Sequence, residues 1–240
     1  MKVTERTPVG DIVAKYPRAA RIFESHRVDY CCGGERPLHE ACATAGVSPA
    51  TILGELLDTT TEAPSDRDWT LASLSDLIAH LVSVHHAYLR AELPVLDAQL
   101  RKVLLAHGAR HGESLTPLSR AFEKLRRELE LHLEKEERVL FPGIQRCEQA
   151  ALGRADARSA GVCRLHEPIE MMEQEHESAG QALRLMRRLT GDYEVPADGC
   201  ATYRALYEGL IRLETDLHLH IHLENNVLFP RTIGLGGAIG

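Results

Sequence analysis

The chain has 240 residues, enough for one large core or for a core with a small satellite domain, and its 44% hydrophobic and 26% charged content is ordinary for a globular protein. The net charge of −7 gives no basic footprint, which argues against a nucleic-acid partner. No apolar run approaches the roughly 18 residues needed to span a bilayer, and residues 1–6 are charged rather than apolar, so we expect a cytoplasmic protein with no membrane partner.

The first 60 residues have the pattern of a small helical domain. Proline and glycine residues separate four predicted short helices, over 9–15, 18–26, 37–45 and 49–57. The polar, Pro-containing stretch 59–66 is typical of a linker. We therefore expect one domain at 1–60 and a second at 69–240.

Two adjacent cysteines, Cys31 and Cys32, stand at a helix break in the first domain and are followed by Gly33 and Gly34. Such a pair can form an easily reduced disulfide or present two thiolates, and the glycines allow close approach by a partner. A pair of buried apolar cysteines is the alternative. We favour a redox or metal-handling role. The other cysteines are scattered and are predicted to be structural: Cys42, Cys147, Cys163 and Cys200.

From Trp69 onward, apolar residues recur at helical spacing and no alternating strand pattern is present. Four long helices are predicted, over 73–107 with a kink at Pro94, 117–149 with a bend or break at 141–143, 168–189, and 199–229 ending at Pro230. The predicted fold class is all-α, with an up-down four-helix bundle following the small N-terminal helical domain.

One motif occurs twice in the predicted bundle. His132-x-x-x-Glu136-x-x-Val-Leu-Phe-Pro recurs as His220-x-x-x-Glu224-x-x-Val-Leu-Phe-Pro. A spacing of four places the imidazole and the carboxylate on one helix face, one turn apart. A single such pair is most often a solvated surface pair, and the Leu-Phe-Pro string alone could mark a repeated helix end. Repetition of both the His and the Glu favours metal ligation.

Single histidines complete the predicted ligand set on the other two helices. Choosing His86 and His176 gives ligand positions 86, 132, 176 and 220, which are 46, 44 and 44 residues apart, so each helix supplies one ligand level. His85 and His80 are alternatives to His86, whereas His176 has no rival within its helix. Two further histidines flank His220 on other faces and are expected to be solvated, to support ligands or to lie at an interface: His218 and His222.

Two buried carboxylates are costly unless a cation compensates them. Four imidazoles with two carboxylates suit iron best, with manganese or zinc as alternatives. Glu136 and Glu224 are then expected to bridge two ions. Nearby acids could orient a ligand imidazole or line a path for ions, although solvent exposure is the default for a helix glutamate: Glu128, Glu173 and Glu175.

The cysteine motif in 29–34 and the string Glu-Asn-Asn-Val-Leu-Phe-Pro-Arg in 224–231, together with both His-x-x-x-Glu elements, resemble the Repair of Iron Centers family over nearly the whole chain. The resemblance implies a hemerythrin-like domain holding two non-haem iron ions bridged by oxo or hydroxo groups and carboxylates. The implied ligands are His86, His132, Glu136, His176, His220 and Glu224. The extra histidines and cysteines depart from the family pattern.

The resemblance implies repair of iron–sulfur clusters damaged by nitric oxide or oxidative stress. The chain would then donate iron to damaged iron–sulfur proteins, with Cys31 and Cys32 serving delivery, redox chemistry or docking. Binding or reduction of NO at the two metal ions is the first alternative, which would make the protein an enzyme or an NO buffer. Binding or sensing of O₂, as in hemerythrin, is the second. A homodimer is compatible with the sequence.

Overall fold

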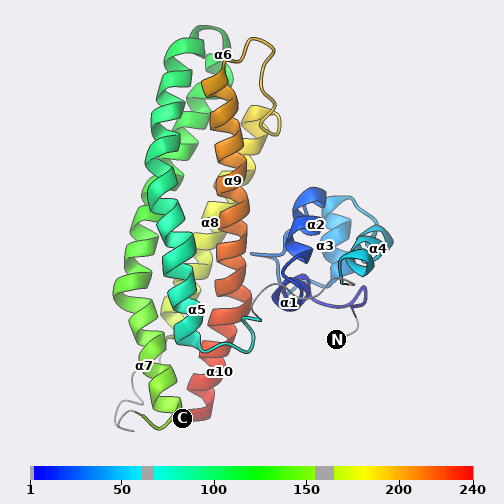
Figure 1. Cartoon of the computed structure of the whole chain (residues 1–240), viewed down its shortest axis with the longest axis vertical. Coiled ribbons are helices and arrows are strands. Elements are labelled where there is room, and N and C mark those ends of the chain that lie inside the picture. The colour runs from blue at the N-terminus through cyan, green and yellow to red at the C-terminus, as the bar shows by residue number, and fades with distance from the viewer. Residues whose placement is uncertain (1–2, 61–67, 155–164, 240) are drawn as a thin grey trace. The chain divides into compact units, whose positions relative to one another are not determined.

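The computed structural model describes residues 3–60, 68–154 and 165–239, and Figure 1 shows helices joined by turns. No strand occurs within these ranges, which confirms the all-α class. The described residues form two compact units. Unit 1 comprises residues from 1–79, 143–169 and 218–240, and unit 2 comprises 80–142 and 170–217. The division at 1–60 and 69–240 stays a prediction.

The N-terminal part of unit 1 forms the four predicted short helices: α1 (Val9–Lys15), α2 (Ala19–His26), α3 (Leu38–Ala45) and α4 (Pro49–Thr60). Helix α3 starts after Pro37 and is followed by Gly46, whose φ of 74° is the left-handed conformation that glycine adopts without strain. The apolar faces of these helices meet in a small core in which Ile12, Phe23 and Ile52 are completely buried.

Unit 2 is built on η1 (Leu81–His86), α6 (Ala87–Lys135), η2 (Glu136–Leu140), and most of α8 (His166–Thr190) and α9 (Ala201–Leu223). Helix α6 consists of two arms, because its backbone breaks at His111 (φ −117°, ψ 19°), and Figure 1 shows these arms running in opposite directions. Leucines and aromatic residues from both arms, α8 and α9 share one core. The two arms of α6, α8 and α9 are the four helices of the predicted bundle.

Prolines in this region do not act as predicted. Pro94 keeps helical torsion angles, and the recorded break within α6 lies at His111. The prediction that the last helix ends at Pro230 is wrong, because α10 (Phe229–Ile239) continues through it, just as α7 (Phe141–Ala151) continues through Pro142. Both prolines stand in the first turn of their helices, where a missing backbone N–H costs least.

A π turn precedes each of these two helices. Turn η2 begins at Glu136 and η4 (Glu224–Leu228) begins at Glu224, and a third π turn, η1, ends at His86. The wider turn shifts the helical register, so the chain continues without a true helix end. Single π turns in α-helices frequently mark functional sites, and here three of the six predicted ligands stand at their ends.

None of the described helices is both long enough and apolar enough to cross a membrane.

Candidate metal centre

Four of the six predicted ligands come together in unit 2, and all four are buried: His86, His132, Glu136 and His176. The Glu136 carboxylate lies between two imidazoles, with Oε2 3.4 Å from His86 Nε2 and Oε1 3.3 Å from His132 Nε2. His176 Nε2 lies 3.1 Å from His132 Nε2. One carboxylate therefore presents an oxygen to each of two imidazoles, as a carboxylate that bridges two metal ions would.

The imidazole of His86 is oriented by an outer carboxylate. Its Nδ1 lies 2.7 Å from Glu137 Oε1, and that same oxygen lies 2.8 Å from Arg90 Nη1. Burial acts to raise the pKa of Glu137, but hydrogen bonds from Arg90 and His86 lower it overall. The ionised Glu137 accepts a hydrogen bond from His86 Nδ1, which orients the imidazole so that Nε2 is directed toward Glu136.

His132 has an equivalent support. Its Nδ1 lies 2.9 Å from Glu175 Oε2, and the other oxygen of Glu175 pairs with Lys135. The hydrogen bond from His132, reinforced by Lys135, lowers the pKa of Glu175 to about 2. Both histidines thus have the carboxylate–imidazole arrangement that outer-sphere residues give to metal ligands.

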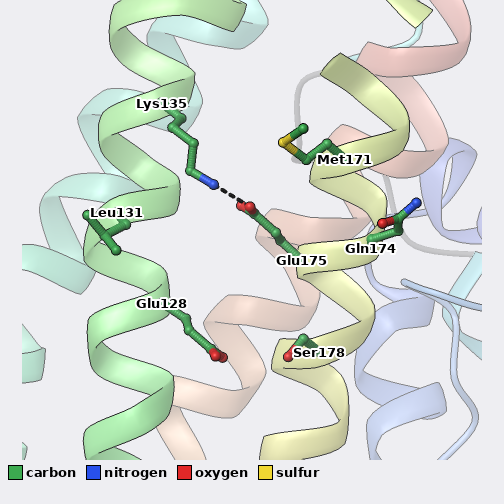
Figure 2. Close-up of a pocket in the computed structure, with 7 residues that line it drawn as sticks. All are labelled: Glu128, Leu131, Lys135, Met171, Gln174, Glu175 and Ser178. Atoms are coloured by element: carbon green, nitrogen blue, oxygen red, sulfur yellow. Dashed lines mark hydrogen bonds and ion pairs between the residues drawn. The ribbon is translucent and has the colours of Figure 1, made fainter. Parts of the chain in front are cut away.

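Figure 2 shows Glu175 reaching from α8 across a surface groove toward Lys135 on the second arm of α6. The groove encloses about 310 Å³ and is lined by Glu128, Leu131, Lys135, Met171, Gln174, Glu175 and Ser178. Of the three acids that the sequence offered as supports, Glu175 contacts a predicted ligand, Glu128 lines the groove and Glu173 is exposed.

Replacing Glu175 with Ala is expected to weaken metal binding about 10- to 100-fold, because His132 loses the group that fixes its tautomer. The measurement is a competition titration of the loaded protein with a chelator. Glu128→Ala is the matched control, since Glu128 lines the same groove and makes no recorded contact with an imidazole. Equal affinity in the two variants would contradict the orienting role.

The second copy of the motif has the same local geometry in unit 1. His220 Nε2 lies 3.2 Å from Glu224 Oε1, and both side chains are buried. The corresponding atoms of His132 and Glu136 are 3.3 Å apart. In both copies the histidine is in the last turn of a long α-helix and the glutamate starts a π turn. Both copies are therefore buried same-face pairs rather than solvated ones.

The neighbouring histidines have other partners. His85 Nδ1 lies 2.9 Å from Asp216 Oδ1. His218 Nδ1 lies 2.7 Å from Glu24 Oε1 on α2, and His222 packs edge-on against Tyr30 at 5.6 Å between ring centroids. The alternative that His222 is solvated is wrong, because it is buried and desolvation lowers its pKa to about 4. It lies instead at an interface within unit 1, as does His218.

The vicinal cysteines stand on a loop organised by Asp29. Its Oδ1 accepts backbone N–H bonds from Cys31, Cys32 and Gly33 at 3.1–3.2 Å. The two sulfur atoms are 3.8 Å apart and no disulfide joins them in this structure. The hydrogen bond with Cys32 and burial raise the pKa of the Cys31 thiol, whereas Cys32 is partly exposed.

Asn226 holds this loop from the other end of the chain. Its Nδ2 donates to the carbonyl oxygens of Tyr30 at 3.2 Å and Cys31 at 3.1 Å. Gly34 and Gly10 leave room for it, because a Cβ on either would lie 2.0 or 2.6 Å from Asn226 Oδ1. The two strings that the sequence analysis singled out therefore touch, two residues beyond Glu224.

Gly34→Ala is expected to destabilise the protein by about 1–3 kcal/mol, because the added methyl group overlaps Asn226 and displaces it or the loop. Urea unfolding measures the change. Gly54→Ala is the matched control: Gly54 lies within α4 with open space around its Cα, so alanine should be neutral or stabilising there. Identical unfolding midpoints in the two variants would contradict the close contact.

Long helices carry buried His-x-x-x-Glu pairs, and carboxylates orient their imidazoles. These features define a hemerythrin-like, cation-binding class of protein. The hemerythrin HHE cation binding domain matches residues 77–232, and a domain of unknown function (DUF542) matches residues 5–60.

Curated relatives resemble the chain over nearly its full length. The iron-sulfur cluster repair protein YtfE of Edwardsiella ictaluri is 37% identical over 95% of this chain and 96% of its own. The proteins of the same name from Musicola paradisiaca and Dickeya chrysanthemi are 38% and 36% identical, over 94% of this chain and 95% and 96% of theirs. The chain belongs to this family of iron–sulfur cluster repair proteins, which confirms the resemblance.

Proposed function

We propose that the chain is a di-iron protein that repairs iron–sulfur clusters damaged by nitric oxide or oxidative stress, and that it does so by supplying iron. Relatives that match it over about 95% of its length carry the name of iron–sulfur cluster repair proteins. The observation that carries the metal part of the proposal is Glu136, a fully buried carboxylate with one oxygen toward each of two oriented imidazoles.

The residues fit two cations that share carboxylates. The residues that would hold the two ions are His86, His132, Glu136, His176, His220 and Glu224. Nitrogen and carboxylate donors in these numbers suit iron, and a set of four donors per ion leaves coordination positions open. When bound, iron supplies an exchangeable cation with one-electron redox chemistry.

Carboxylates of the chain orient the ligand imidazoles, and this would support the exchange of metal ions at the site. Glu137 and Glu175 pair with Nδ1 of His86 and His132, an arrangement that would orient the two Nε2 atoms toward the cations. The completely buried carboxylate of Glu136 carries a desolvation cost that bound cations would offset. Loss of metal therefore carries an electrostatic penalty that reloading removes.

The experiment follows labelled iron. Protein loaded with an iron isotope is mixed with a [4Fe–4S] protein whose cluster has been damaged by NO, and cluster absorption, enzyme activity and isotope content of the client are measured. We expect recovery with label in the rebuilt cluster. Recovery from unlabelled iron alone would overturn the supply role, and no recovery would overturn repair.

A further inference from the structure

A second group of metal-binding side chains lies far from the candidate centre. His107 and His111 on α6 and Asp198 before α9 have ligand atoms that all lie within 4.8 Å of one another. Along α6, His107 is roughly 30 Å from His86 at 1.5 Å of rise per residue. In Figure 1 the turn of α6 and the start of α9 share one end of unit 2.

The geometry of this group comes from a break in the helix. His111 is the residue with non-helical torsion angles at which the two arms of α6 meet, and its Nε2 lies 2.9 Å from Asp198 Oδ1. The ring of Tyr203 packs edge-on against His107, with centroids 5.3 Å apart, and against His111. An aromatic side chain thus limits the orientation of both imidazoles.

A thiol adjoins the same group. Cys200 follows Asp198 by two residues and is exposed, so its predicted structural role is not supported. A hydrogen bond with His107 lowers its pKa to about 7, so a substantial fraction is thiolate at neutral pH. The end of the bundle therefore offers two nitrogens, a carboxylate and a sulfur.

We propose that His107, His111 and Asp198 bind a zinc-type divalent cation, with Cys200 as the fourth ligand. Zn²⁺ takes four nitrogen, oxygen and sulfur donors at about 2.0–2.3 Å in a tetrahedron, which puts the donors roughly 3.3–3.8 Å apart. The ligand atoms of His107, His111 and Asp198 already lie within 4.8 Å of one another and reach that spacing by small side-chain rotations. Cys200 adjoins this group through its hydrogen bond with His107. Magnesium and calcium prefer oxygen donors and fit this mixed set poorly.

An ion pair is the competing interpretation of the cluster. Arg110 Nη1 lies 3.2 Å from Asp198 Oδ2, and hydrogen bonds from His111 and Arg110 lower the pKa of Asp198. Arg110 is largely exposed, so its side chain can turn into solvent when a cation arrives. The cation then replaces the hydrogen bond between His111 and Asp198. The bound cation would link the turn between the two arms of α6 to the segment before α9. Because it binds only the folded protein, it would raise the melting temperature.

The test uses the iron-loaded protein, so that the main centre is filled, and titrates it with Zn²⁺ and with Co²⁺ as a spectroscopic probe. The wild type should take up one further cation, show a thiolate-to-cobalt charge-transfer band and melt at higher temperature. His107→Ala/Asp198→Ala should lose all three signals. Cys200→Ser should lose the band and bind more weakly, by at least the roughly tenfold that loss of a supporting residue causes.

Two further variants separate a metal site from an ion pair. Arg110→Ala removes the competing charge and should strengthen binding, whereas His39→Ala removes an exposed histidine elsewhere and should change nothing. The double variant Glu136→Ala/Glu224→Ala should keep this site, so its result is independent of the di-iron proposal. Equal uptake by wild type and His107→Ala/Asp198→Ala, or no uptake by either, would overturn the zinc site and leave an ion pair.

Discussion

Glu136→Ala/Glu224→Ala is expected to abolish iron binding, from about two ions per chain to none. Each glutamate is completely buried beside the histidine one turn before it. Without them the four histidines provide only neutral donors, and nothing offsets the charge of two buried cations. Metal content by mass spectrometry and the absorption bands of an oxo-bridged iron pair give the readout.

The control is Glu130→Ala/Glu134→Ala, which removes one exposed and one partly exposed glutamate from α6. It should retain iron and spectrum. Circular dichroism of all variants checks that helices persist. A folded wild type that contains zinc or no metal would contradict the di-iron assignment, and so would full iron content in the Glu136→Ala/Glu224→Ala protein.

The same double variant should invert the order of stability between the metal-free and iron-loaded states. In the metal-free protein, removing two buried carboxylates relieves a desolvation penalty, so the variant should melt above the metal-free wild type. With iron present the wild type gains binding free energy that the variant lacks, so the order reverses. Thermal melts with and without iron measure both comparisons.

Local periodicity was sufficient to predict the pairing inside each motif. His132 follows Leu118, Phe122, Leu125 and Leu129 on one face, and all of these are buried, so the imidazole had to point inward. A neighbour four residues on shares that face. The burial of Glu136 and Glu224 follows from the same four-residue spacing, because helix geometry depends only on residues that are close in sequence.

Contacts between distant segments were beyond this reasoning. Glu137 stands next to Glu136 in sequence but points to His86 on another helix, so it was not singled out. Asn226 contacts Cys31, 195 positions away, and no periodicity links the two. The π turns η2 and η4 were missed because Pro142 and Pro230, which follow them, resemble helix ends. Cys200 was read as structural because its neighbour His107 comes close only through folding.

Cys31→Ala/Cys32→Ala should reduce cluster repair at least tenfold while leaving iron content unchanged. The pair stands on its own loop, held by Asp29 and Asn226, and neither sulfur belongs to the His and Glu ligand set. Thiolates are the natural ligands of iron in such clusters, so they can hold iron during delivery. The assay is the labelled-iron transfer to a damaged client, with NO binding to the ferrous protein measured in parallel.

The outcomes separate repair from NO chemistry. If the cysteines deliver iron, the double variant binds NO as the wild type does and fails in repair. Between the single variants, Cys32→Ala should be the more damaging, because Cys32 is partly exposed whereas Cys31 is buried with a raised pKa. Undiminished repair in the double variant would remove the cysteines from delivery. The bundle alone would then have to release iron to the client.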